Sequence, residues 1–142
     1  MTRINLVPVE ELSDQHLIAE YHELPRVVKQ KISIDGAPRE YCLGKGHMKW
    51  ARLHLLFTLN RYYELCWEMK ERGFKVNYSD AEFSLFCLES EIAREYLWED
   101  YIPTEKDIKL SRDRIIEKIK QKPNWYKWTN REKPYYLGEN ND

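Results

Sequence analysis

The sequence predicts an all-α fold, a compact single domain of three main helices plus a shorter one. A chain of 142 residues has the length of one domain. It holds 10 tyrosines and 5 tryptophans but only 5 glycines and 6 prolines, which disfavours a turn-rich β-sandwich. Apolar residues recur at helical spacing in several long segments. We therefore expect one domain over residues 1–142, with about 137–142 frayed.

The amino-terminal residues predict an extended segment that leads into a helix. Residues 1–6 should run extended, with Ile4 and Leu6 packed between the helices. Two helix starts are then possible. Pro8 precedes two acids that would favour the positive end of a helix dipole, and Ser13 is a plausible N-cap.

The first helix should bury one face and present charged groups on another. Its apolar stripe consists of Leu12, Leu17, Tyr21, Leu24 and Val28. His16, Glu20 and Glu23 share a second face because they are spaced at i, i+4 and i+7. Pro25 should kink the helix, since it removes one backbone hydrogen bond. Such a kink could bend Arg26 toward the same ligand as Glu23.

Residues 47–72 give the strongest helical pattern, after a polar connection over 29–46. Gly73 is the expected stop. The predicted apolar band consists of Trp50, Leu53, Phe57, Leu59, Tyr63, Cys66, Trp67 and Met69. In the connection, Gly44-Lys45-Gly46 is too short for a phosphate-binding loop and predicts a turn.

Two further helices are predicted toward the carboxyl end. Ser79 begins a capping-box pattern for an acidic helix to about Leu97. Thr104 should cap a basic helix over 105–121, which Pro123 closes. The inward side of the basic helix should carry Ile108, Ile115 and Ile119.

Net charge is −1, which alone argues against a nucleic-acid binder. The charges are, however, separated along the chain. Residues 80–100 are acidic, whereas residues 105–135 hold an excess of lysine and arginine. A molecule with one basic face can bind a polyanion despite a balanced total. The three cysteines form no CxxC pair, which favours reduced thiols over a disulfide framework or a zinc site.

Several segments resemble the pyrimidine-dimer DNA glycosylase/AP lyase family, the ultraviolet-repair enzymes of the endonuclease V type. The resemblance is densest at the amino terminus, in Thr2-Arg3-Ile4-Asn5-Leu6, Asp14-Gln15-His16-Leu17, Ala19-Glu20-Tyr21 and Glu23-Leu24-Pro25-Arg26-Val27. It continues in Leu43-Gly44-Lys45-Gly46-His47, Asp100-Tyr101-Ile102-Pro103 and Trp125-Tyr126-Lys127. The chain departs from the family at His22, where arginine is typical, and in a shorter connection before residue 43.

The resemblance implies a DNA glycosylase with AP lyase activity that excises cyclobutane pyrimidine dimers. In this family the initiator methionine is removed, so the nucleophile would be the α-amine of Thr2 and the catalytic carboxylate that of Glu23. An α-amine has a pKa of about 8, so an appreciable fraction is neutral at pH 7 and able to form a Schiff base. The implied DNA contacts are Arg3, Gln15, His16, His22, Arg26, Arg114, Lys118, Trp125, Tyr126 and Lys127.

No cofactor or metal is expected. The histidines show no HExxH spacing, and His47 and His54 are most simply satisfied or surface residues. The expected partner is double-stranded DNA containing ultraviolet lesions or abasic sites. We expect a monomer in the cytoplasm of a bacterial or phage-infected cell, with no membrane-spanning run.

Plainer interpretations remain open for individual residues. Most helical glutamates are solvated acids, and Glu20 fits a structural role. Arg114 and Lys118 fit a solvated charged face as well as a DNA contact, and at least two aromatics of 125–128 favour packing. The function itself has two alternatives, a lyase of the same fold for abasic sites or other damaged bases and a non-catalytic DNA-binding relative.

Overall fold

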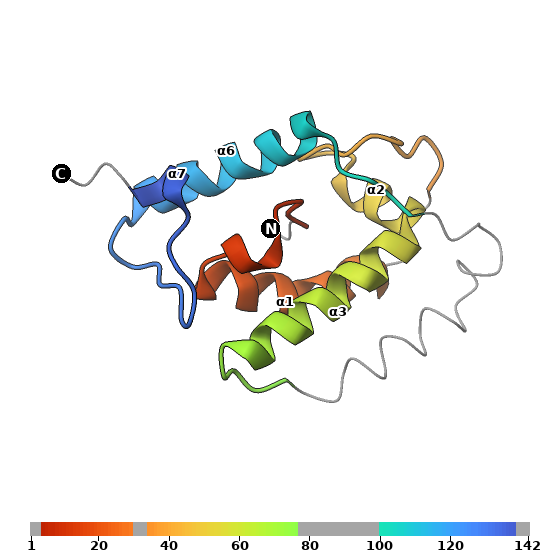
Figure 1. The fold of residues 1–142 in the computed structure, drawn as a ribbon. Helices are drawn as coiled ribbons and strands as arrows, with labels where there is room; N and C mark the ends of the chain where they lie inside the picture. Colours follow the sequence, from red (N-terminus) through yellow and green to blue (C-terminus); the bar gives the residue numbers. More distant parts are fainter. Residues whose placement is uncertain (1–3, 30–33, 77–99, 139–142) are drawn as a thin grey trace.

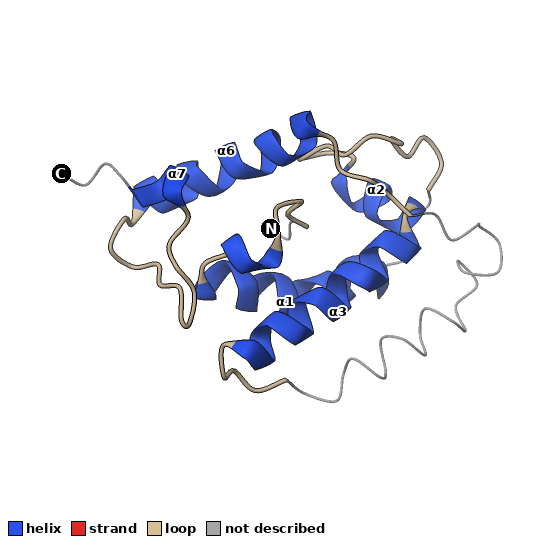
Figure 2. Cartoon of the chain, in the orientation of Figure 1, coloured by secondary structure: helices blue, strands red, loops and turns tan. Residues whose placement is uncertain are grey.

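The computed structural model describes residues 4–29, 34–76 and 100–138, and all regular secondary structure in these ranges is helical (Figures 1 and 2). The elements in chain order are the 3-10 helix η1 (Val9–Glu11), α1 (Asp14–Lys29), α2 (His47–Leu53), α3 (Leu55–Glu71), α6 (Glu105–Gln121) and α7 (Tyr135–Gly138). Three long helices and shorter ones confirm the predicted all-α class. The acidic helix predicted over 79–97 lies outside the described residues.

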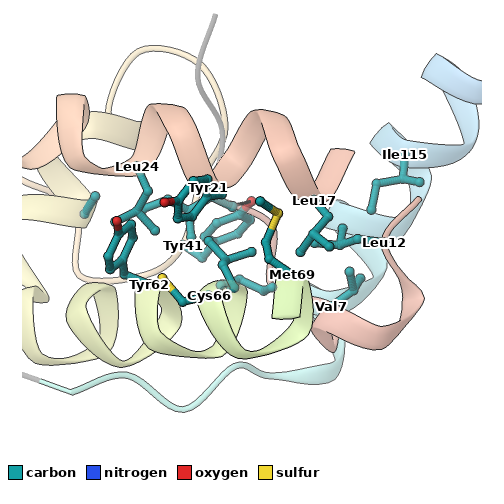
Figure 3. Close-up of a cluster of buried hydrophobic side chains, with 14 of the residues drawn as sticks. Val7, Leu12, Leu17, Tyr21, Leu24, Tyr41, Tyr62, Cys66, Met69 and Ile115 are labelled. Carbon is teal, nitrogen blue, oxygen red and sulfur yellow. Dashed lines mark hydrogen bonds between the residues drawn. The ribbon is translucent and has the colours of Figure 1, made fainter. Parts of the chain in front are cut away.

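The core lies between α1 and α3, and α6 closes it from the other side of the amino-terminal segment (Figure 1). Leu17, Tyr21 and Leu24 of α1 face Tyr62, Cys66 and Met69 of α3 (Figure 3). The first described residues lie between α6 and α1, as predicted for an extended segment packed between helices (Figure 1).

The first helix begins at the second of its two possible starts. Ser13 Oγ accepts a hydrogen bond from the His16 amide at 3.1 Å, so Ser13 is the N-cap of α1. Pro8 instead precedes the separate turn of η1. Pro25 does not end α1, which continues to Lys29.

The prediction of one helix over 47–72 is wrong, because the chain breaks at His54. This residue leaves helical geometry, with φ −111° and ψ 60°. Its ring Nδ1 lies 2.9 Å from the carbonyl oxygen of Trp50, so the side chain competes for a backbone group of the helix. Thr58 Oγ1 then donates to the Ala51 and His54 carbonyls at 3.0 and 2.9 Å, and these bonds satisfy oxygens at the junction of α2 and α3.

Two residues of the predicted apolar band are also wrongly placed. Tyr63 is 45% exposed and Trp67 is 68% exposed. The buried stripe of α3 follows i, i+3, i+4 and i+7 spacing through Tyr62, Leu65, Cys66 and Met69, so residues 63 and 67 fall on the neighbouring face.

The basic helix is found where the sequence predicts it, as α6. Thr104 Oγ1 accepts from the Asp107 amide at 3.1 Å, and the Asp107 carboxylate accepts from the Thr104 amide at 3.0 Å. This reciprocal capping box fixes the start of α6, and the helix ends at Gln121, two residues before Pro123. Ile115 and Ile119 are buried and Ile108 is partly buried, in agreement with the predicted inward face.

Candidate functional site

The predicted nucleophile is carried by the amino terminus, and the structure describes this terminus from Ile4 onward. Thr2 and Arg3 lie outside the described residues. Ile4, Leu6 and Val7 are buried, with Ile4 0% exposed. The chain two residues beyond Thr2 is therefore fixed in the core.

The Glu20 carboxylate packs against the amino-terminal segment, and both of its oxygens accept hydrogen bonds. Its carboxylate accepts from Arg61 Nε at 2.7 Å and Nη2 at 3.2 Å. It also accepts from the Asn5 side-chain amide at 2.8 Å and the Asn5 backbone amide at 3.3 Å. Since both charged side chains are at most 4% exposed, Glu20 forms a buried ion pair that ties α1 to α3 and to the amino-terminal segment.

Glu23 lies one turn further along α1 and is only half-buried. Within the described residues, its carboxylate makes no hydrogen bond or ion pair. His22 and Arg26 are exposed on the same part of the helix. Of the two glutamates on this side of α1, Glu23 is therefore the one accessible to a ligand.

The other end of α1 carries a cluster of aromatic and basic groups around His16. The His16 ring stacks on Tyr126 with ring centroids 4.8 Å apart, and its Nδ1 lies 3.1 Å from Ser13 Oγ. Burial, reinforced by the positive charges of Arg114 and Lys118 on α6, lowers the pKa of His16 to about 4. The imidazole is consequently neutral at pH 7, and the positive charge here belongs to the two α6 side chains.

Gln15 holds the loop that carries the aromatic residues. Its side-chain amide donates to the Trp125 carbonyl at 2.8 Å and accepts from the Lys127 amide at 3.1 Å. Asp14 supports the same loop, because its carboxylate accepts from the Thr129 amide and hydroxyl at 3.0 and 2.6 Å. Gln15 thus positions the loop, and its predicted DNA contact stays a prediction.

The aromatic side chains of the loop divide between packing and exposure. Tyr126 packs on His16, and Trp128 Nε1 donates to the Glu11 carbonyl at 3.0 Å. Trp125 is 52% exposed, with the Lys122 ammonium 5.2 Å from its ring centroid. Lys127 is exposed. Two of the three aromatics therefore pack against the protein, as expected, and Trp125 is free to contact a ligand.

Three residues that support the amino-terminal segment were not predicted from the sequence, namely Arg61, Tyr41 and Ser111. Arg61 gives one sequence signal, since it lies within the buried stripe of α3 beside Tyr62 and Leu65. A charged residue inside an apolar stripe predicts a buried partner of opposite charge, because an unpaired buried charge is costly. Tyr41 and Ser111 give no comparable signal because their contacts depend on the tertiary fold.

Two other kinds of site can be assessed within the described ranges. Histidine, cysteine, aspartate and glutamate side chains there do not gather in groups of three or more suited to a metal ion. None of the helices in these ranges is long and apolar enough to cross a membrane.

The candidate site therefore runs along one side of α1, from the His16 cluster past the buried Glu20 to Glu23 and Arg26. A family model described as pyrimidine dimer DNA glycosylase matches residues 1–82. This match covers more than half of the 142 residues and includes η1, α1, α2 and α3. The chain belongs to the pyrimidine dimer DNA glycosylase family of DNA repair enzymes.

Proposed function

We propose that this protein excises cyclobutane pyrimidine dimers from duplex DNA through a Schiff base on the Thr2 amine, and then cleaves the strand as an AP lyase. The family membership supports the lesion and the glycosylase step. The observation that carries the chemistry is the contrast between the two glutamates of α1. Glu20 is 2% exposed and occupied by Arg61 and Asn5, whereas Glu23 is accessible one turn away.

The reaction needs an amine and one carboxylate. The neutral amine of Thr2 attacks C1′ of the deoxyribose, the N–C bond forms, and the glycosidic electrons leave with the base. The nitrogen then gives one proton to the carboxylate, the C1′–O4′ bond breaks, and O4′ takes up a proton. This opens the sugar ring and leaves a protonated imine between C1′ and the Thr2 nitrogen. Removal of a C2′ proton then breaks the C3′–O bond, so the strand on the 3′ side leaves with a 5′ phosphate and the sugar keeps a C2′–C3′ double bond. Water finally hydrolyses the imine.

Glu23 would act at three points of this sequence. A carboxylate stabilises the cationic sugar during base loss, accepts a proton from the amine, and removes the C2′ proton in the elimination. Burial in an ion pair would prevent all three, because a carboxylate saturated by four donors has no site left for a proton. This is the physical reason to assign the role to Glu23 and not to Glu20.

The same side of α1 suits the DNA backbone. His16 and Arg26 are ten residues apart, which corresponds to about 15 Å along a helix or the length of about four base pairs. Arg114 and Lys118 supply positive charge at one end, and Arg26 supplies it at the other. Trp125 could stack against a base or sugar at the edge of this surface.

Borohydride trapping tests the proposal directly. The protein with Thr2 at its amino terminus is incubated with duplexes that contain a pyrimidine dimer, an abasic site or neither, and the imine is reduced to a stable adduct. We expect adducts with the first two duplexes and none with undamaged DNA. Matched variants are Glu23→Gln and a protein with one extra residue before Thr2, and both should form no adduct with the dimer duplex.

Each alternative function predicts a different result. An adduct with abasic DNA alone would show a lyase without the dimer glycosylase activity. This alternative is suggested by His22, which stands where the family typically has arginine. Binding without an adduct on either duplex would show a non-catalytic relative. An active protein with a blocked amino terminus would refute the assignment of the Thr2 amine.

A further inference from the structure

The backbone of residues 4–7 is held by side chains and not by secondary structure. Five of its polar groups bond to residues from five separate parts of the chain. The bonds are Ile4 N to His47 Nε2 at 2.8 Å, Tyr41 hydroxyl to Ile4 O at 2.6 Å, Asn5 N to Glu20 Oε1 at 3.3 Å, Leu6 N to Ser111 Oγ at 3.0 Å, and Arg61 Nη1 to Val7 O at 2.7 Å.

His47 holds the residue nearest the proposed nucleophile. The Ile4 amide donates to His47 Nε2, so this nitrogen must be unprotonated. The proton of the neutral ring is then on Nδ1, which donates to the Cys42 carbonyl at 2.8 Å. The Cys42 bond orients the ring, and the ring in turn fixes Ile4. His47 is 1% exposed, so water does not replace this acceptor.

The bond to Ile4 limits where the amine can lie. Two residues separate the Ile4 nitrogen from the Thr2 nitrogen, and such a length of chain reaches about 7 Å at most. A group confined to a sphere of that radius has an effective concentration of about 1 M. If the Ile4 bond were lost, the next held amide would be Asn5, the reach would rise to about 11 Å, and the accessible volume would grow about fourfold.

From this geometry we propose that His47 is a positioning residue for the Thr2 amine. It fixes Ile4 so that the amine is held beside the reacting sugar, without touching DNA itself. This inference rests on the proposed function, because it assumes that the Thr2 amine is the nucleophile. A purely structural role would instead satisfy a buried backbone donor and leave the chemistry of a folded variant unchanged.

Two substitutions separate the two hydrogen bonds of the ring. In His47→Gln, the side-chain oxygen reaches the position of Nε2 and can accept from Ile4. In His47→Asn, the shorter amide occupies the position of Nδ1 and can still donate to Cys42, but the Ile4 bond is lost. Tyr41→Phe gives an independent variant, since it removes the hydroxyl that donates to the Ile4 carbonyl.

The rate of trapped-adduct formation is measured under single-turnover conditions with an abasic duplex, together with the dissociation constant for DNA and the melting temperature. We expect His47→Asn to slow trapping between threefold and tenfold with unchanged DNA affinity. His47→Gln should recover the rate to within twofold. Tyr41→Phe should slow trapping in the same direction and also leave affinity unchanged.

Equal trapping rates in wild type and both His47→Asn and Tyr41→Phe would overturn the positioning role while leaving the proposed function intact. So would a rate in His47→Gln as low as in His47→Asn. If His47→Asn did not fold, Tyr41→Phe alone would decide between the outcomes. A wild-type protein that forms no adduct would overturn the proposed function, and this inference with it.

Discussion

Because Glu20 forms a buried ion pair with Arg61, we predict that substituting Glu20 lowers stability far more than substituting Glu23, three residues along the same helix. In Glu20→Gln the side chain keeps its size but loses its charge. Arg61 is only 4% exposed and would be left as an uncompensated cation. The new amide group would also place a donor against the donors of Arg61 or Asn5. Both effects destabilise the folded state.

Loss of one partner from a buried ion pair costs about 3–5 kcal/mol. A domain of this class is stable by about 5–15 kcal/mol, so the variant should lose a large part of its free energy of unfolding. The corresponding fall in melting temperature is about 10 °C for a chain of this length. Glu23→Gln changes a half-buried surface group and should alter stability by less than about 0.5 kcal/mol. Urea unfolding of both variants measures the contrast.

A third variant tests the physical reason for the loss. Adding Arg61→Met to Glu20→Gln removes the unpaired charge and leaves an apolar side chain of similar length. If the uncompensated cation causes the loss, the double variant should be more stable than Glu20→Gln alone, despite losing the bond to Val7. A double variant less stable than the single one would contradict the reasoning, as would equal stabilities of Glu20→Gln and Glu23→Gln.

Three further predictions concern pH, salt and capping. The pKa of His16 is lowered from 6.5 to about 4, so unfolded chains protonate first as the pH falls, and stability is lost between these values. Between pH 7 and pH 4, the free energy of unfolding of wild type should fall by about 3 kcal/mol more than that of His16→Asn. Equal losses for the two proteins in unfolding titrations would refute the lowered pKa. Arg114→Gln and Lys118→Gln should each reduce the slope of log affinity for DNA against log salt by about one, whereas Lys109→Gln, on an exposed pair with Asp113, should not. Thr104→Ala should cost about 1 kcal/mol in urea unfolding and Thr104→Ser much less, because serine retains the cap.

The parts of the fold that the sequence predicts well are those governed by local signals. Thr104 marks the start of α6, and Pro123 follows its end by two residues. In the same way, Ser13 marks the start of α1 and Gly73 follows the end of α3. Gly73 has φ +84°, a left-handed conformation that glycine adopts without strain at a helix end. Such signals depend only on neighbours, so they can be identified without knowing the tertiary structure.

The parts that could not be predicted depend on partners far apart in sequence. Forty-one residues separate Glu20 from Arg61, and 105 separate Leu6 from Ser111. The break at His54 was missed for a different reason. Its supporting hydrogen bonds join residues only four and seven positions apart, but no glycine or proline marks the break in the sequence. The family resemblance supplied Glu23, whereas the buried residues that hold the amino-terminal segment, Tyr41, Arg61 and Ser111, came only from the structure.

These long-range polar contacts give the amino-terminal segment a fixed register that apolar packing would not. Ile4, Leu6 and Val7 are all aliphatic, so a shift of the chain by one residue could still bury apolar groups. The same shift would move the Thr2 amine, the proposed nucleophile, by about 3.5 Å, whereas a misplacement of about 1 Å can already slow a reaction on the order of a hundredfold. It would also take the side-chain amide of Asn5 away from Glu20, and that amide has no equivalent in the aliphatic neighbours. The buried polar and charged side chains therefore set the register of residues 4–7, at some cost in desolvation, and the aliphatic residues keep this segment in the core.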